Sequence, residues 1–242
     1  MLALAIDTST SAITAALRDG EHTYLRTRTD SRGHAEWLSP QISELFTEAG
    51  RTPSDLTHVI AGEGPGPFTG LRVGLVTAET IALATNAQYI GLCSLDALAA
   101  AAIRHGALEA HSDFLVASDA RRKEVYWATY HWAGTTNENP TLATSLTRTS
   151  EPAVTKPADL PEHVRALPTV GRGPHLFPDF FPHSIGPLDV DARDLLDLAY
   201  AHHDAGTLPT HKRAHPLYLR RPDAKANATA PLVPAAASES RE

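Results

Sequence analysis

Residues 62–74 read Gly-Glu-Gly-Pro-Gly-Pro-Phe-Thr-Gly-Leu-Arg-Val-Gly, and this stretch decides how the chain is interpreted. A short apolar run at 59–61 predicts a strand before it, and a helical pattern at 69–85 follows. Small residues recur at every fourth position of that helix, at Gly70, Gly74, Ala78 and Ala82. Residues four apart share a helix face, so they form a flat stripe that lets another backbone approach closely. We interpret this stripe as a docking surface.

The composition is that of a globular protein. The chain has 242 residues, of which 42% are hydrophobic and 20% are charged, and its formal net charge is −7. This length suits one large domain or two small ones. The negative charge argues against autonomous binding of nucleic acid, which needs a basic face, but leaves action on RNA within a complex open. With Cys93 as its one cysteine, the chain has no internal disulfide and no thiolate-rich metal site.

The two ends of the chain suggest where it works and where its fold stops. The N-terminus lacks the basic region and cleavage site of a signal peptide, and no apolar run is long enough to cross a bilayer. We therefore expect a soluble, cytoplasmic protein. Residues 222–242 are mostly alanine, proline, serine and charged residues, which predicts a disordered, dispensable tail.

The first half of the chain predicts an α/β unit. Strand patterns at 2–8, 12–17 and 21–29 form a meander, with Asp19-Gly20 as a hairpin turn. A helix then ends at Gly50, and Pro40 must lie in its first turn or kink it. The remaining predicted elements are a strand at 59–61, the helix at 69–85, a strand at 88–92 and a helix at 94–105.

The pattern then restarts. An apolar run at 114–118 ends in Asp119, as the first strand ends in Asp7, and a paired strand follows at 124–132. Further elements are a strand within 141–147, a strand at 167–171 and a helix at 191–205 that Asp191 caps. The repetition predicts a duplicated α/β unit. We place the boundary near Arg104, with an N-terminal subdomain at 1–104 and a C-terminal subdomain at 105–221.

Two acidic turns occupy equivalent places in the two units: Asp7-Thr8-Ser9-Thr10-Ser11 and Asp119-Ala120-Arg121-Arg122. Each could hold a metal or phosphate, although each alone is more simply a turn with local hydrogen bonds. The repeated units resemble the actin, hexokinase and heat-shock-ATPase superfamily, which has the ribonuclease-H-like fold. Its phosphate loops carry a glycine after the aspartate, where this chain has Ser9 and Arg121. The resemblance implies degenerate phosphate-loop residues at Asp7, Thr8, Ser9, Asp119 and Arg121.

Four motifs make the resemblance more specific. They are Ala5-Ile6-Asp7-Thr8-Ser9-Thr10, His34-Ala35-Glu36, the Gly64–Gly74 block and Asp119-Ala120-Arg121-Arg122-Lys123-Glu124-Val125-Tyr126. Their order resembles that of the TsaB family, the YeaZ-type glycoprotease-like proteins. The match is dense over the first half and looser beyond it. Pro67 departs from the serine usual in the family, which removes a hydroxyl and an amide donor from the loop.

This resemblance implies a non-catalytic scaffold subunit that binds a TsaD-type catalytic paralogue. With a TsaE-type ATPase subunit, the paralogue places threonylcarbamoyl on N6 of the adenosine next to the anticodon, in tRNAs that read codons beginning with A. We expect a homodimer when the chain is alone, indirect contact with tRNA through the complex, no membrane partner and no cofactor. The expected partner-contact residues are His34, Trp37, Leu38, Gln41, Leu45, Thr69, Gly70, Arg72, Val73, Gly74, Thr77, Ala78 and Ile81.

Metal-ligand patterns are weak. TsaD-like enzymes bind a metal through paired histidines on a helix, and the corresponding region at 94–99 has no histidine. His34 and Glu36 are two apart and do not share a helix face, and prolines bracket His211 and His215. We expect no metal and no catalytic residue. The alternative is an active enzyme, either a metal-dependent peptidase or an ATP-dependent, sugar-kinase-like protein, which metal content and ATP turnover would reveal.

Overall fold

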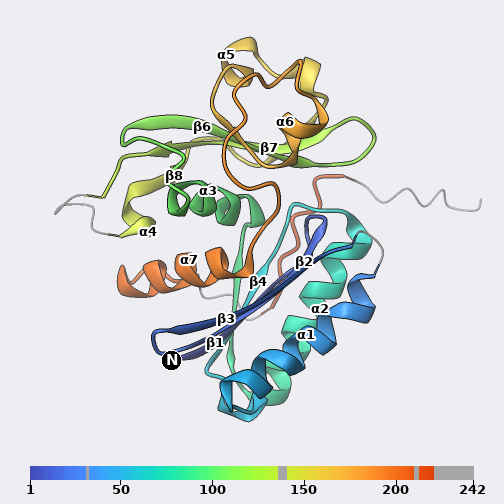
Figure 1. Cartoon of the computed structure of the whole chain (residues 1–242), viewed down its shortest axis with the longest axis vertical. Coiled ribbons are helices and arrows are strands. Elements are labelled where there is room, and N and C mark those ends of the chain that lie inside the picture. The colour runs from blue at the N-terminus through green and yellow to red at the C-terminus, as the bar shows by residue number, and fades with distance from the viewer. Residues whose placement is uncertain (31–32, 136–140, 210–212, 221–242) are drawn as a thin grey trace, which may run out of the picture.

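The computed structural model describes residues 1–30, 33–135, 141–209 and 213–220. Two β-sheets alternate with layers of helices (Figure 1). Helices α1 (His34–Ala49) and α2 (Phe68–Thr85) cover the outer face of the first sheet. Helices α3 (Ser94–Arg104) and α7 (Ala192–Asp204) lie between the two sheets.

The first sheet confirms the predicted meander. Its strands are β1 (Leu2–Asp7), β2 (Ala12–Asp19), β3 (His22–Thr29), β4 (His58–Gly62) and β5 (Gln88–Leu92), in the order β3-β2-β1-β4-β5. Strand β1 pairs antiparallel with β2 and parallel with β4. Gly20 has a φ of 59° in the β2–β3 hairpin turn, a conformation that glycine adopts without steric cost.

Alternating side chains divide the core of this sheet. Leu4 and Ile6 pack with the apolar faces of α1 and α2, whereas Ala3 and Ala5 face α3 and α7. The alanines allow these two helices to approach the sheet closely. The end of β1 is therefore enclosed on both faces.

The second sheet repeats this arrangement. Its strands are β6 (Ser112–Asp119), β7 (Val125–Trp132), β8 (Leu146–Arg148), β9 (Ala153–Thr155) and β10 (Thr169–Val170). The order is β10-β6-β7-β8, and β9 also pairs with β7. As in the first sheet, the leading strand pairs antiparallel with the second and parallel with a later one. The duplicated α/β fold of the ribonuclease-H-like class is thereby confirmed.

Short helices complete the chain. They are α4 (Leu142–Ser145), α5 (Glu162–Arg165), α6 (Arg172–Leu176) and the 3-10 turns Pro53–Asp55 and Pro157–Asp159. Asp191 caps α7, as predicted, because its side chain accepts a hydrogen bond from the Arg193 N–H. Among the described residues, no helix has the length and apolar character needed to span a membrane.

Two local predictions were wrong in detail, and of the two alternatives predicted for Pro40, a place in the first turn is excluded. Residues 141–147 start as helix α4, because Thr141 and Thr144 form a capping box, and strand β8 begins only at Leu146. The strand predicted at 167–171 shrinks to Thr169–Val170, between Pro168 and a left-handed Gly171. Pro40 lies in the second turn of α1 on its exposed side, where water can satisfy the carbonyl that lacks a helical donor.

The predicted boundary near Arg104 falls between the two sheets, since β5 ends at Leu92 and β6 begins at Ser112. Helix α7 belongs to the later part of the sequence but packs on the first sheet (Figure 1). The division into 1–104 and 105–221 stays a prediction. The predicted tail at 222–242 lies outside the described residues.

Candidate functional site: two acidic turns and the outer face of α2

The Asp7 turn is enclosed by the protein. Asp7 is fully buried, and its Oδ1 accepts hydrogen bonds of 2.7 Å from both the N–H and the hydroxyl of Ser9. Its Oδ2 accepts a 2.6 Å hydrogen bond from Ser94, the first residue of α3. Burial raises the pKa of Asp7 above its ordinary value, and the hydrogen bonds from the two serines oppose that rise. Both carboxylate oxygens are therefore occupied inside the chain.

The glycine-rich loop packs directly on this turn. A Cβ at Gly62 would overlap Asp7 Oδ2, and a Cβ at Gly66 would lie 2.7 Å from the carbonyl oxygen of Ser9. The Gly64 N–H donates a 3.1 Å hydrogen bond to Ser94 Oγ, which links the loop to α3. These glycines thus allow close approach of the chain to itself.

The small-residue stripe of α2 also faces inward. Thr8 Oγ1 donates a 2.7 Å hydrogen bond to the Gly70 carbonyl and accepts a 3.0 Å hydrogen bond from the Gly74 N–H. A Cβ at Gly74 would overlap that hydroxyl, and Gly70, Gly74, Ala78 and Ala82 are all buried. Our interpretation of the stripe as a docking surface was wrong, because it seats α2 on this chain's own sheet.

The Asp119 turn is more open. The Asp119 side chain is 18% exposed and accepts a 2.7 Å hydrogen bond from the Arg121 N–H, while Arg121 Nη1 lies 3.1 Å from Asp119 Oδ2. Arg121, Arg122 and Lys123 have φ values of 61°, 54° and 62°. The backbone thus adopts a conformation that favours glycine, although the sequence has none there.

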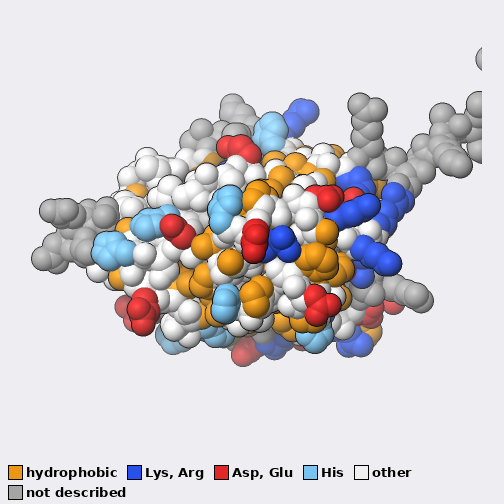
Figure 2. Space-filling model, turned by 90° about the horizontal axis from the view of Figure 1, so that it is seen from above, with side chains coloured by type: hydrophobic (Ala, Val, Ile, Leu, Met, Phe, Trp, Pro, Cys, Tyr) orange, Lys and Arg blue, Asp and Glu red, His pale blue; other side chains and the backbone are white. Residues whose placement is uncertain are grey.

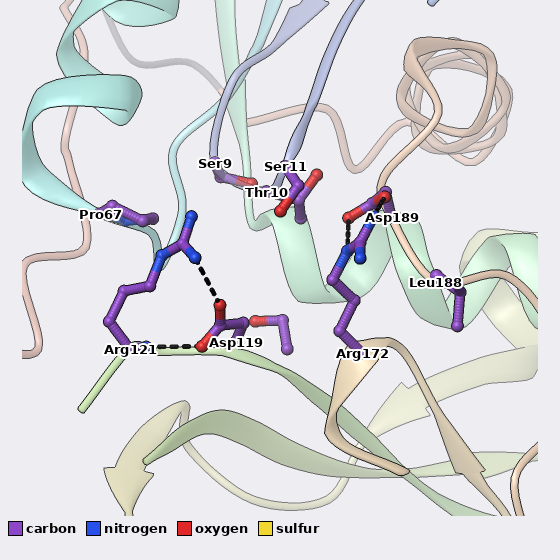
Figure 3. Close-up of a pocket in the computed structure, with 10 residues that line it drawn as sticks. Ser9, Thr10, Ser11, Pro67, Asp119, Arg121, Arg172, Leu188 and Asp189 are labelled. Atoms are coloured by element: carbon purple, nitrogen blue, oxygen red, sulfur yellow. Dashed lines mark hydrogen bonds and ion pairs between the residues drawn. The ribbon is translucent and has the colours of Figure 1, made fainter. Parts of the chain in front are cut away.

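The two turns face each other across a narrow cleft (Figure 3). Arg172 closes one side through hydrogen bonds of 2.7 and 2.6 Å to the two oxygens of Asp189. The cavity has a volume of about 10 Å³, which is room for about one water molecule, whereas small-molecule pockets measure about 300 Å³ or more. Its lining residues are Ser9, Thr10, Ser11, Pro67, Ser118, Asp119, Arg121, Arg172, Leu188 and Asp189.

The structure brings Ser9, Asp119 and Arg121 of the predicted phosphate-loop set to this cleft, while Asp7 and Thr8 are buried behind it. Sequence reasoning missed Ser94 and the Arg172–Asp189 pair. Ser94 lies two residues after β5 and Asp7 is the last residue of β1, and both strands pair in parallel with β4. Because the carboxyl ends of parallel strands meet at one edge, that position could have been recognised.

The outward face of α2 contains none of the small stripe residues and is exposed to solvent. Thr69 and Arg72 are exposed, and Val73, Thr77 and Ile81 are partly exposed. Two apolar side chains on this helix stand out, since Val76 is 60% and Leu83 is 86% exposed. They are seven residues apart and share one helix face.

Helix α1 contributes less surface than predicted. Leu38, Gln41 and Leu45 are buried, so these expected contact residues belong to the core. Trp37 is partly exposed, and the guanidinium carbon of Arg28 lies 3.4 Å from its ring centroid. The side chain of His34 lies outside what the structure describes.

Residues 213–220, which we call the C-terminal strap, run from α2 to the Asp119 turn. The N–H groups of His215 and Leu217 donate hydrogen bonds to Glu63, at 2.7 and 2.8 Å. Tyr218 lies with its ring centroid 5.0 Å from that of Phe68 and accepts a 3.0 Å hydrogen bond from Arg72. His211, the predicted companion of His215, lies outside the described residues. No group of three or more His, Cys, Asp or Glu side chains positioned to hold a metal ion occurs in the described part of the chain.

Comparison with known proteins identifies the family to which the chain belongs. An uncharacterized protein of Mycobacterium tuberculosis is 37% identical over 227 residues, which cover 92% of this chain and 93% of that protein. The Escherichia coli tRNA threonylcarbamoyladenosine biosynthesis protein TsaB is 32% identical over 238 residues, which cover 91% and 95%. This chain belongs to the TsaB family. The family model for TsaD, tRNA N6-adenosine threonylcarbamoyltransferase, matches residues 28–164, so this chain also belongs to that wider family.

Solved structures agree with the TsaB assignment. YeaZ from Pseudomonas aeruginosa is 28% identical, with a TM-score of 0.72 over 90% of this chain and 99% of that chain. A second Pseudomonas aeruginosa structure, described as an uncharacterized protein with similarity to peptidase YEAZ, is 27% identical with a TM-score of 0.75 over the same shares.

Proposed function

We propose that this chain is a non-catalytic subunit in the synthesis of threonylcarbamoyladenosine on tRNA, and that it acts by binding a TsaD-type catalytic paralogue. Membership of the TsaB family supports the pathway, since the Escherichia coli relative carries that function in its name. The single observation that carries the non-catalytic role is the cleft of about 10 Å³ between the two acidic turns.

The chemistry of the cleft supports this role. A phosphate site built on such turns needs backbone N–H groups that are open to the ligand, and free carboxylate oxygens to hold the cation that accompanies the phosphates. Here Asp7 uses both oxygens within the chain, and the ion pair of Arg172 with Asp189 occupies the opposite wall. A substrate would have to break these contacts before it could bind.

The outward face of α2 is the proposed docking surface. Val76 and Leu83 expose apolar side chains at one side of the helix, and Arg72 and Thr69 extend that side toward its first turn. Exposed Leu and Val grouped on one face indicate an interaction site. A paralogue with the same fold would present an equivalent helix, so one surface serves the complex and a homodimer of the chain alone. A TsaE-type ATPase subunit would then join this pair.

The docking surface is tested by Leu83→Glu. A buried carboxylate at the interface should weaken binding of the TsaD-type paralogue at least about tenfold and abolish the homodimer, with an unchanged melting temperature. Leu176→Glu is the matched control, because Leu176 is 43% exposed on the distant α6. Size-exclusion chromatography with light scattering measures complex formation and homodimerisation for both variants. If Leu83→Glu binds the paralogue with wild-type affinity, the outward face of α2 is not part of the interface.

The non-catalytic role is tested on the purified chain alone. We expect no ATP hydrolysis, peptidase activity or threonylcarbamoyl transfer, and no stoichiometric metal. An activity that survives rigorous purification and disappears in Asp119→Ala would instead identify an enzyme.

A further inference from the structure

The guanidinium of Arg72 is held over two aromatic rings near the start of α2. Its central carbon lies 3.8 Å from the ring centroid of Phe68, on the same helix, and 5.9 Å from that of Tyr218, in the C-terminal strap. Arg72 Nε also donates a 3.0 Å hydrogen bond to the Tyr218 hydroxyl. Stacking and this hydrogen bond together fix the plane of the guanidinium before any partner binds.

The strap holds Tyr218 in place from both sides. On one side, the Leu217 N–H donates a 2.8 Å hydrogen bond to the Glu63 carbonyl, just after β4. On the other side, Arg220 donates a 2.8 Å hydrogen bond to the Ala120 carbonyl. The folded chain has therefore already ordered the arginine side chain, whose loss of rotamer freedom would otherwise weaken binding of a partner.

The positive charge of Arg72 has no carboxylate partner within the described part of the chain. Its side chain is exposed, and its contacts there are the two rings and the Tyr218 hydroxyl. By contrast, Arg26, Arg104 and Arg172 each pair with a carboxylate. The terminal nitrogens of Arg72 thus remain available for a bidentate contact with an anion.

The surroundings of Arg72 require that anion to come from a partner. Helical spacing places Arg72 on the same face of α2 as Val76 and Leu83. A partner that covers these apolar side chains would also take the guanidinium out of water, and a buried unpaired charge is strongly unfavourable. In Figure 1, α2 begins at the end of the molecule where Figure 2 shows Lys and Arg side chains gathered, which favours an acidic contact over a basic one.

We propose that Arg72 forms a bidentate ion pair with an aspartate or glutamate side chain of the TsaD-type paralogue, and that Tyr218 positions it for this contact. The inference rests on the proposed function, which brings the paralogue to the outward face of α2. It gives the C-terminal strap a part in partner recognition. A carboxylate carries one negative charge, which one guanidinium neutralises, whereas a terminal phosphate carries up to about two.

A second copy of this chain is a poorer partner for Arg72. The acidic residue of α2 is Glu79, and its Oε1 already accepts a 2.7 Å hydrogen bond from the Ala214 N–H in the strap. A homodimer would therefore present a carboxylate that is partly in use. Arg72 should contribute more to binding of the paralogue than to homodimerisation, which makes it a residue that determines partner choice.

The test measures the affinity of the full chain for the TsaD-type paralogue by calorimetry without nucleotide. Arg72→Gln should weaken binding at least about thirtyfold, because it leaves the partner's carboxylate buried and unpaired. Arg72→Lys keeps the charge but loses the planar fork, and should weaken binding about tenfold. Arg165→Lys is the matched control, since that guanidinium also lies over a ring, 5.7 Å from the centroid of Phe180, but on the distant α5. It should change the affinity less than about twofold.

The positioning role of Tyr218 is tested with a double-mutant cycle. Tyr218→Phe removes the hydroxyl that accepts the hydrogen bond from Arg72 Nε, and should weaken binding of the paralogue about threefold. In the Arg72→Gln background it should have no further effect, because the hydroxyl acts through the guanidinium. The same loss in both backgrounds would mean that Tyr218 acts independently of Arg72, and its positioning role would be wrong.

The outcomes separate this inference from the proposed function. If Arg72→Gln binds the paralogue like the wild type while Leu83→Glu does not, the ion pair is overturned and the docking surface stands. If the Arg72 variants lose affinity only when ATP is present, the anion is a phosphate and the inference is wrong. It is equally wrong if they weaken the homodimer as strongly as the complex. A wild-type chain that does not bind the paralogue overturns both proposals.

Discussion

The Asp7 turn and the Asp119 turn end the first strands of the two repeated units, but their surroundings are opposite. Asp7 is fully buried beneath the glycine loop and α2, whereas Asp119 is part of a cationic turn at the surface. In the first unit, β4 is five residues long and leads into the 18-residue α2. In the second, β10 has two residues and leads into the five-residue α6.

This difference shows how duplicated units diverge. The element that follows the parallel partner strand decides whether the acidic turn is covered. A long helix with a small-residue stripe covers the first turn and makes it structural. A short helix leaves the second turn partly exposed at the surface.

The largest effect should come from Gly62→Ala. The added Cβ overlaps Asp7 Oδ2 and lies 2.7 Å from Ser94 Oγ, so the substitution should lower the free energy of unfolding by about 3 kcal/mol or prevent folding. Gly206→Ala is the control, because a Cβ there meets no atom within 4 Å and only its φ of 67° is unfavourable, which costs about 1 kcal/mol. If urea denaturation shows the same loss of unfolding free energy for Gly62→Ala and Gly206→Ala, the glycine-rich loop does not pack closely on the Asp7 turn.

Removal of each carboxylate tests the comparison directly. Asp7→Ala leaves the buried donors of Ser9 and Ser94 without an acceptor and should cost about 3 kcal/mol. Asp119→Ala removes a partly exposed ion pair and should cost about 1 kcal/mol or less. Chemical denaturation of both variants gives the two values. A reversed order would mean that the second turn, not the first, is the structural one.

The pH dependence of stability should expose the buried carboxylate. Because burial raises the pKa of Asp7 above 3.8, the folded state binds its proton more readily than the unfolded state does. The penalty for ionising Asp7 is then present at neutral pH and is relieved as the pH falls toward 4. The unfolding free energy of the wild type, relative to Asp7→Asn, should therefore rise as the pH is lowered from 7 to 4. A flat difference would contradict the burial of an ionised Asp7.

The smallest effect should come from Arg121→Gly. Glycine relieves the left-handed backbone by about 1 kcal/mol, and the lost ion pair with Asp119 offsets about 0.5 kcal/mol of that gain. The variant should be as stable as the wild type or slightly more so. It restores the glycine of a phosphate loop, yet ATP should still fail to bind in calorimetry, because the Asp7 turn and the Arg172–Asp189 pair keep the cleft closed. If Arg121→Gly binds ATP in calorimetry, then Arg121 is the residue that prevents ATP binding in the wild type.

Much of the local structure followed from the sequence. Asp19-Gly20 marked the first hairpin, Gly50 marked the end of α1, and Asp191 marked the start of α7. These signals succeed because caps and tight turns depend on a few adjacent residues. The capping box at Thr141 and the left-handed Arg121-Arg122-Lys123 turn were missed. The second of these has no sequence signature, since its residues do not favour the backbone that they adopt.

The sequence by itself determined the order of the elements of the first sheet, the repetition of the unit and the motifs that mark the TsaB family. Only the tertiary structure decided which side of α2 is inside. A stripe of small residues permits close approach by a partner helix or by the chain's own sheet, and periodicity does not distinguish these neighbours. Tertiary structure also decided that the cleft is narrow, because Ser9 of the first unit and Asp119 and Arg172 of the second line it together only when the two sheets pack against each other.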